Sequence, residues 1–174
     1  MKLTLQTCDV RSWHPRDVAS LVTHANNPRV AINLRDRFPS PYTPHDGREF
    51  IKMARGMTPE SLFAIAVNGE AVGGIGFVPL HDVERVSSEV GYWLGEAYWG
   101  RGITTEALMA ITRYAMETHG FTRMFALPFA FNEASCRVLE KAGYVLEAHL
   151  HKSAIKSGTV IDQLQYAFVA PDPT

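Results

Sequence analysis

The chain has 174 residues, of which 46% are hydrophobic and 20% charged, with a formal net charge of −1. These values fit one globular domain and show no basic excess, which disfavours a nucleic-acid-binding role. No stretch approaches the run of about 18 apolar residues that a membrane span needs. We therefore expect one domain over residues 1–174, cytoplasmic, with neither a nucleic-acid nor a membrane partner.

The two cysteines, Cys8 and Cys136, lie outside any CxxC spacing or His/Cys cluster. Isolated thiols of this kind are typical of reduced cytosolic proteins. We expect neither a disulfide nor a metal site.

The first half of the chain predicts a strand, two helices and a hairpin. Apolar and polar residues alternate near Leu3–Thr7, which indicates a strand, and a helix is expected over Arg16–Asn26. The run Thr43-Pro44-His45-Asp46 combines an N-cap threonine, a first-turn proline and an acid, which predicts a helix ending near Gly56. Asn68-Gly69 joins two apolar runs, 61–67 and 70–78, and so predicts a β-hairpin.

The second half alternates strands and helices. The expected strands are 87–94, 123–127, 144–150 and 160–169, and the expected helices are 103–119 and 132–142. Gly120 and Gly143 suit the left-handed position after each helix, and Ala107, Ile111 and Ala115 mark a buried stripe. This order predicts an α/β (α+β) fold with one mixed, mostly antiparallel twisted sheet of about seven strands and helices on both faces.

The turn between residues 94 and 103 carries the strongest functional signal. A strand leads into Gly100-Arg101-Gly102, and a helix follows. The N–H groups at a helix N-terminus lack partners within the helix, and glycines let an anion approach them, so this turn is a candidate phosphate site. A plain glycine-rich turn is the alternative reading. A dinucleotide-binding turn is disfavoured, because Thr105 stands where its third glycine would be, and no Gly-Lys-Ser/Thr is present for a P-loop.

The segment Tyr98-Trp99-Gly100-Arg101-Gly102-Ile103-Thr104-Thr105-Glu106-Ala107 resembles the acyl-CoA signature of the GNAT superfamily of N-acetyltransferases. It is most similar to the branch of the ribosomal-protein N-terminal (alanine/serine) acetyltransferases. Two positions depart from the general pattern: Trp99 replaces Gln or Arg, and Thr104 replaces Gly or Ala. The resemblance implies a GNAT fold and acetyl-CoA as co-substrate without a metal, with cofactor contacts from Gly100, Arg101, Gly102, Ile103, Thr104 and Thr105.

A second block, Asn132 to Tyr144, matches the family pattern N-x-x-S-x-x-V-x-x-K-x-G-F/Y. Asn132 is placed to cap the helix, and the resemblance adds a hydrogen bond to the pantetheine arm. Many members carry a tyrosine on this helix that acts as general acid to the leaving thiolate, and Leu139 occupies its position here. The resemblance therefore gives the general-acid role to Ser135. Lys141 and Arg137 are candidates for the adenosine phosphates, or else form a solvated helix face.

The resemblance implies direct attack of a primary amine on the thioester, with backbone N–H groups near Trp93 and Leu94 stabilising the oxyanion. Glu89 is the first candidate for the base, and His149 and His151 are the second.

An α-amine, with a pKa of about 7.7–8.0, needs less help than lysine, at about 10.4. The acceptor is therefore expected to be a protein N-terminus or a small amine, and the segment 37–43 is expected to form one wall of its site. Two alternative functions stay open: a non-catalytic acyl-CoA-binding module and, more distantly, a nucleotide-dependent oxidoreductase. A homodimer is a further open alternative for the assembly.

Overall fold

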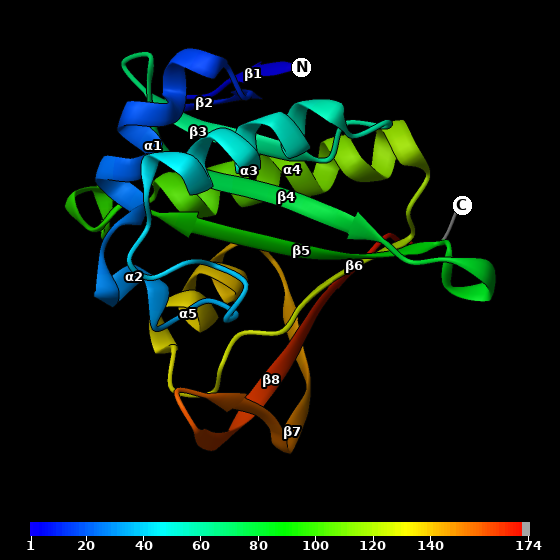
Figure 1. Cartoon of the computed structure of the whole chain (residues 1–174). Helices are drawn as coiled ribbons and strands as arrows, with labels where there is room; N and C mark the ends of the chain where they lie inside the picture. The colour runs from blue at the N-terminus through cyan, green and yellow to red at the C-terminus, as the bar shows by residue number, and fades with distance from the viewer. Residues whose placement is uncertain (172–174) are drawn as a thin grey trace. The chain divides into compact units, whose positions relative to one another are not determined.

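The computed structural model describes residues 1–171, and this part of the chain contains eight strands (Figure 1). The strands are β1 (Lys2–Thr4), β2 (Asp9–Ser12), β3 (Leu62–Val67), β4 (Glu70–Pro79), β5 (Ser87–Leu94), β6 (Arg123–Ala126), β7 (Val145–Lys156) and β8 (Thr159–Val169). They form one open sheet in the order β1-β2-β3-β4-β5-β6-β8-β7.

The sheet is mixed, as predicted. Strands β5 and β6 are parallel, whereas the pairs β1–β2, β2–β3, β3–β4, β6–β8 and β7–β8 are antiparallel. The helices are α1 (Val18–Ala25), α2 (Pro28–Ala31), α3 (Pro44–Gly56), α4 (Ile103–His119) and α5 (Glu133–Lys141).

The chain groups into two compact units. Unit 1 comprises Met1–Gly76 and Tyr92–Ala107, and unit 2 comprises Phe77–Gly91 and the chain from Leu108 onward. Strands β4 and β5 and helix α4 contribute residues to both units, and each unit is described by itself below. That residues 1–174 form a single acetyltransferase domain stays a prediction, and its last three residues lie outside the described part.

Unit 1 opens with a hairpin where one strand was predicted. The chain reverses after β1, with the Leu5 N–H donating to the Cys8 carbonyl at 2.9 Å, and Leu3 pairs with Val10. The turn contains neither glycine nor proline, so the sequence contained no sign of a reversal. The predicted strand therefore continued to Thr7 on the alternating pattern alone. This second strand, β2, accounts for eight strands where about seven were expected.

The predicted hairpin between β3 and β4 is confirmed. Asn68 and Gly69 both have positive φ, 51° and 85°, and Val67 pairs with Glu70. Two residues of positive φ form the turn whose twist matches that of the flanking strands, which explains the preference for Asn-Gly.

The first helices begin at the caps that the sequence contains. The Thr43 hydroxyl accepts from the Asp46 N–H at 3.3 Å, and the Asp46 carboxylate accepts from the Thr43 N–H at 2.8 Å, which completes a capping box for α3. Helix α2 was not predicted from the sequence. The Asn27 side chain caps it by accepting from the Arg29 N–H at 2.8 Å, and Pro28 occupies its first turn.

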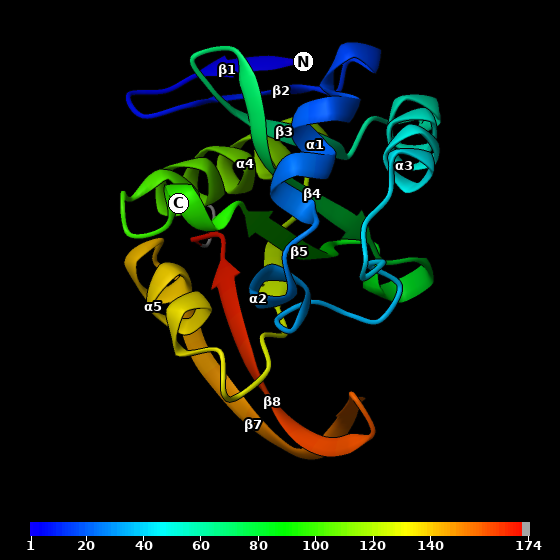
Figure 2. The same ribbon diagram turned by 60° about the vertical axis from the view of Figure 1, so that its left-hand side comes forward.

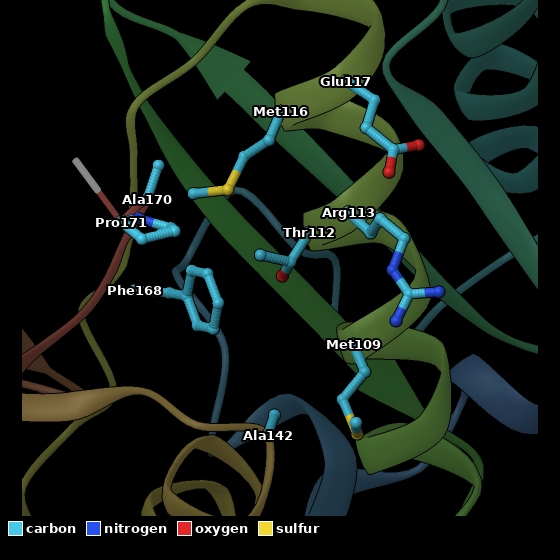
Figure 3. A pocket seen from close by; sticks show the side chains of 9 residues that line it. All are labelled: Met109, Thr112, Arg113, Met116, Glu117, Ala142, Phe168, Ala170 and Pro171. Atoms are coloured by element: carbon cyan, nitrogen blue, oxygen red, sulfur yellow. The ribbon is translucent and has the colours of Figure 1, made fainter. Parts of the chain in front are cut away.

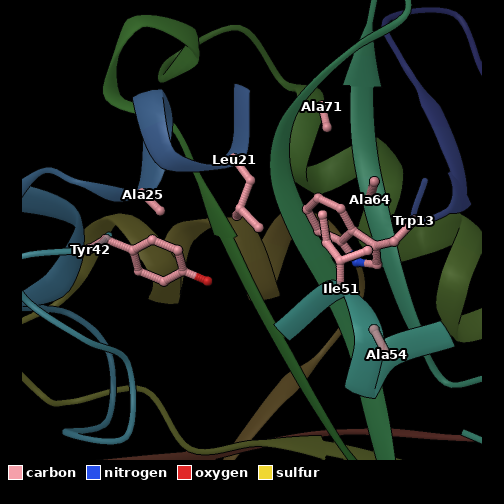
Figure 4. Close-up of a cluster of buried hydrophobic side chains, with 8 residues drawn as sticks. All are labelled: Trp13, Leu21, Ala25, Tyr42, Ile51, Ala54, Ala64 and Ala71. Atoms are coloured by element: carbon pink, nitrogen blue, oxygen red, sulfur yellow. The ribbon is translucent and has the colours of Figure 1, made fainter. Parts of the chain in front are cut away.

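The core of unit 1 lies between helices α1 and α3 and the strands they cover (Figures 2 and 4). Trp13 contacts Phe50 edge-to-face at a centroid distance of 5.4 Å. Small residues beside large ones let the layers approach closely. The buried cluster consists of Trp13, Leu21, Ala25, Tyr42, Ile51, Ala54, Ala64 and Ala71.

Unit 2 is built on the rest of α4, strands β5, β6, β8 and β7, and helix α5. Gly120 and Gly143 follow the two helices with φ of 72° and 88°, as predicted. The predicted stripe is also confirmed, since Ala107, Ile111 and Ala115 are fully buried. Among the described residues, no helix is both long and apolar enough to cross a membrane.

Candidate functional site

A closed loop joins β5 to α4 in unit 1. The Trp99 indole Nε1 donates to the Leu94 carbonyl at 2.7 Å, and the Gly95 N–H donates to the Val72 carbonyl at 2.8 Å. A 3₁₀ turn, Glu96–Tyr98, lies between them. Trp99, which departs from the family pattern, therefore links the two ends of the loop by a hydrogen bond.

Two glycines follow in a conformation that other residues rarely adopt. Gly100 and Gly102 have φ of 75° and 77°, and a Cβ added to either would meet no atom within 4 Å. The conformation, rather than a clash with the protein, is what requires glycine. The space beside each Cα is open, as a backbone site for an anion needs.

Helix α4 begins directly after this turn. The hydrogen bond from the Glu106 N–H to the Gly102 carbonyl, at 3.1 Å, is the first of the helical pattern. The N–H groups of Ile103, Thr104 and Thr105 precede it, at the positive end of a helix that runs to His119. The turn therefore has the geometry of an anion site.

Helix α2 braces this loop, a role that the sequence did not reveal. Arg29 forms an ion pair with Glu96, and the Asn27 amide donates to the same carboxylate at 2.7 Å. The Arg29 guanidinium also lies 5.7 Å from the centre of the Trp99 ring. The loop is thus held from outside as well as by Trp99.

The Arg101 side chain contacts the preceding residues of the same loop. Its guanidinium donates to the Ala97 carbonyl at 2.7 Å and lies 5.2 Å from the centre of the Tyr98 ring. The contact between Arg101 and a cofactor phosphate stays a prediction.

Glu106 ties the N-terminal hairpin to the first turn of α4. Its carboxylate accepts from the N–H groups of Gln6 and Thr7, at 2.8 and 2.9 Å, and from the Thr7 hydroxyl. Desolvation acts to raise the pKa of this carboxyl group, but the three hydrogen bonds outweigh it and lower the pKa. Sequence analysis assigned no role to Glu106.

Two glycines of β4 make room for the end of β5. A Cβ on Gly73 would lie 2.5 Å from the Trp93 carbonyl oxygen, and one on Gly74 would lie 2.7 Å from Trp93 Nε1. The backbone beside Gly73 leaves no room for a side chain, so this position requires glycine, whereas a Cβ at Gly74 would displace the Trp93 ring. Two adjacent glycines inside a predicted strand, Gly73 and Gly74, were the sequence feature from which this close approach of Trp93 could have been predicted.

Aromatic side chains gather beside Trp93. Phe38 lies 5.7 Å from Trp93 and 5.0 Å from Tyr42, centroid to centroid. Burial raises the pKa of Tyr42 to about 12, so its hydroxyl stays protonated. The segment that the resemblance assigned to the acceptor wall, 37–43, thus contributes to an aromatic group with the Trp93 side chain.

The predicted α5 residues belong to unit 2. The Asn132 Oδ1 accepts from the Ser135 N–H at 3.1 Å, so Asn132 caps the helix as expected. Leu139 is fully buried, while Lys141 is exposed. Arg137 pairs with Glu133 at 3.3 Å, one turn earlier.

The candidate bases also belong to unit 2. Glu89 is half-buried on β5, opposite Phe125 of β6. His149 and His151 share one face of β7, with ring centroids 4.2 Å apart, and both contact Asp162. The predicted residues thus divide: Trp93, Leu94 and the turn lie in unit 1, while Glu89, Asn132, Ser135 and Lys141 lie in unit 2.

A cavity of about 330 Å³ in unit 2 lies beside α4 (Figure 3). Met109, Thr112 and Met116 face it from successive turns of the helix, and Phe168 faces it from β8. None of the predicted site residues lines this cavity.

Residues 9–145 match the family model of the acetyltransferase (GNAT) domain. The chain belongs to the GNAT acetyltransferase family. It is 33% identical to an uncharacterized N-acetyltransferase, YoaA, of Bacillus subtilis over 59% of this chain and 57% of that one. It is 27% identical to a ribosomal-protein-serine acetyltransferase of Escherichia coli over 61% and 59%. The matches span less than two thirds of these curated relatives.

Solved structures support the fold. A ribosomal L7/L12 alpha-N-protein acetyltransferase in complex with coenzyme A has a TM-score of 0.87 at 18% identity, covering 98% of both chains. The microcin C7 self-immunity acetyltransferase MccE, in complex with acetyl-CoA and AMP, has a TM-score of 0.82 at 20% identity, covering 95% of this chain and 93% of that one.

Proposed function

We propose that this protein is an N-acetyltransferase that transfers the acetyl group of acetyl-CoA to a primary amine. The observation that carries the proposal is the turn before α4, with two positive-φ glycines beside open space, in a chain of the GNAT family. A pyrophosphate fits this turn because N–H groups at the helix N-terminus can bind its oxygens.

Cofactor binding is assigned to both units. The N–H groups from Gly102 to Thr105 hold the pyrophosphate, and the neighbouring Gly100 keeps the approach open. Arg101 and Lys141 are proposed for the adenosine phosphates, and Asn132 for the pantetheine arm. The roles of Asn132 and Lys141 are proposed from the family resemblance of their block.

Bound acetyl-CoA would supply an acetyl thioester, and the residues of this chain orient the reaction around it. Backbone N–H groups near Trp93 and Leu94 stabilise the developing oxyanion. Ser135 donates a proton or a hydrogen bond to the departing sulfur, and Glu89, directly or through water, accepts the proton of the amine.

We propose an α-amine as the acceptor, either a protein N-terminus or a small amine. The similarity to the E. coli ribosomal-protein-serine acetyltransferase and to the ribosomal L7/L12 alpha-N-protein acetyltransferase supports this choice. The partly buried side chains of Phe38 and Trp93, backed by the buried Tyr42, offer an apolar wall for the residue that carries the amine.

Ligand binding and turnover test the proposal in two steps. Acetyl-CoA should raise the melting temperature more than NAD or ATP does, because a ligand that binds the native state stabilises it. Thiol release should then follow with N-terminal serine or alanine peptides or with small amines, and should be absent with N-terminally blocked peptides. Stabilisation by NAD instead would indicate an oxidoreductase. Binding without turnover on any acceptor would indicate a non-catalytic module.

Glu89→Gln tests the base. The variant should lower kcat at neutral pH and recover part of the loss at high pH, where more of the amine is already deprotonated. A pH–rate profile is the measurement, and Glu117→Gln, at an exposed position of α4, is the control. An unchanged profile would remove Glu89 from the mechanism.

A further inference from the structure

Strands β7 and β8 form a hairpin in unit 2 (Figure 1). Two imidazoles and one carboxylate meet on this hairpin. His149 Nε2 and His151 Nδ1 lie 2.6 and 3.1 Å from the same oxygen, Oδ2 of Asp162. One nitrogen from each ring and a carboxylate oxygen all lie within 4.8 Å of one another. None of these three residues belongs to the turn proposed for acetyl-CoA.

The register of the hairpin brings the three residues to one face, and a bulge in β7 lies at the same place. Leu150 pairs with Gln163 and Ala154 pairs with Ile161, so three residues of β7 stand opposite Asp162 alone. Lys152, in the middle of the three, has a φ of 51° and donates its N–H to Asp162 Oδ1 at 2.8 Å. The Lys152 N–H therefore holds Asp162 Oδ1 in place, and Asp162 Oδ2 faces the two imidazoles.

The ring arrangement suits a shared ligand. His149 and His151 are two residues apart on one strand face, and their rings stack at 27° with centroids 4.2 Å apart. Their side chains are 47% and 75% exposed, against 31% for Asp162, so an ion can reach the cluster from solvent.

The donor set is that of a divalent transition metal. Imidazole nitrogen with a carboxylate oxygen suits zinc and its neighbours, whereas magnesium and calcium prefer oxygen alone. Zinc bonds of about 2.0–2.2 Å in a tetrahedral site place ligand atoms about 3.3–3.5 Å apart. The present 2.6 and 3.1 Å would have to open by less than about 1 Å, which exposed side chains on a bulge allow.

The charge of the carboxylate favours the same ion. The hydrogen bond from the Lys152 N–H, followed by those from His149 and His151, lowers the pKa of Asp162 to about 2. Asp162 is therefore ionised, as a carboxylate that binds a metal must be.

From this geometry we infer that His149, His151 and Asp162 form a binding site for one zinc-class divalent ion. Asp162 Oδ2 is the oxygen ligand, and Oδ1 stays on the Lys152 amide, which orients the carboxylate as the outer hydrogen bonds of metal sites do. Water completes the coordination. The sequence predicted no metal because Asp162 lies 13 and 11 residues from the two histidines, and only the pairing of β7 with β8 brings them together.

Calorimetric titration of the untagged protein with Zn²⁺, in a buffer that does not bind zinc, tests the site. One ion should bind per chain, and Mg²⁺ should not compete. His149→Gln, His151→Gln and Asp162→Asn should each weaken binding roughly tenfold or more, because each removes a ligand or its charge. Asp162→Asn keeps an oxygen for the Lys152 amide, and His45→Gln, an exposed histidine of α3, is the control that should bind normally.

A melting curve without metal shows whether each variant is folded, and the exposed His151 gives a variant that disturbs the hairpin least. Equal affinity in the triple variant His149→Gln/His151→Gln/Asp162→Asn would overturn the inference, as would the absence of binding in the parent protein. Binding that needs both histidines but not Asp162 would also overturn it, because it would indicate a two-histidine surface chelate.

Discussion

The two helices that carry the family blocks begin in different ways. Helix α5 has its own cap, since the Asn132 side chain accepts from the Ser135 N–H at 3.1 Å. Helix α4 follows Gly102, which has no side chain and a φ of 77°. A capped N-terminus satisfies its own donors, whereas one that follows glycine leaves them for a ligand. This difference supports the proposal that α4 binds the anion and that α5 contributes side-chain chemistry.

The largest expected effect is at Gly102. Gly102→Val should weaken acetyl-CoA binding on the order of a hundredfold or more, because at least two charge-assisted hydrogen bonds of about 1.5–3 kcal/mol each would be lost. Gly120→Val at the other end of α4 is the matched control, with a φ of 72° and equally open space. Both should lose stability, but only Gly102→Val should lose affinity in calorimetry. Equal affinities in folded protein would refute the anion site.

Ser135→Ala should lower kcat by roughly tenfold to a hundredfold. General acids usually contribute more, about 10²–10⁴-fold, but a thiolate with a pKa near 8.5 can leave without a proton. Cofactor affinity should change far less, because charge on sulfur develops during the reaction. Ser135→Thr, which keeps the hydroxyl, should restore much of the rate. If Ser135→Ala keeps a normal kcat, Ser135 is an ordinary residue of the first turn of α5 and takes no part in the reaction.

Asn132 separates capping from cofactor binding. Asn132→Ala should reduce the free energy of unfolding by about 1 kcal/mol, the usual value of a lost cap. Asn132→Asp keeps the capping oxygen but not the amide N–H₂. It should retain stability and lose acetyl-CoA affinity if the side chain donates to the cofactor. Thermal melts beside calorimetry distinguish the two roles, and full affinity in Asn132→Asp would leave only the cap.

The smallest effect is expected at Glu106. Its pKa is lowered in the folded state, so its contribution to stability is present above the usual glutamate range and is lost as the pH falls through the folded pKa. Glu106→Gln should lower the melting temperature slightly at neutral pH, and the difference should shrink in acid. Exposure keeps the effect small. Glu117→Gln on the same helix is the control, and a difference that grows in acid would contradict the argument.

Elements with strong local signals were predicted from the sequence. Helix α4 follows the bounds expected from its glycine at either end, and α3 follows its capping box. The Asn68-Gly69 turn likewise depends on adjacent residues alone. Each of these signals lies within a few residues of the structure that it specifies.

Features that depend on residues far apart were missed. Nothing near Glu106 in the sequence indicates that it accepts from Gln6 and Thr7, about 100 residues earlier. The short α2, whose Arg29 pairs with Glu96, was not predicted either. Such contacts arise from tertiary packing, which periodicity does not encode.

The bond between the Trp99 indole and the Leu94 carbonyl places a fluorophore on the loop that precedes α4. Trp99 is 40% exposed, whereas Trp13 is 3% exposed in the core. Collisional quenching by iodide should therefore act on Trp99 far more than on Trp13. A ligand at the neighbouring turn should shield Trp99 and reduce that quenching, so the native protein carries an optical reporter of its own proposed binding site.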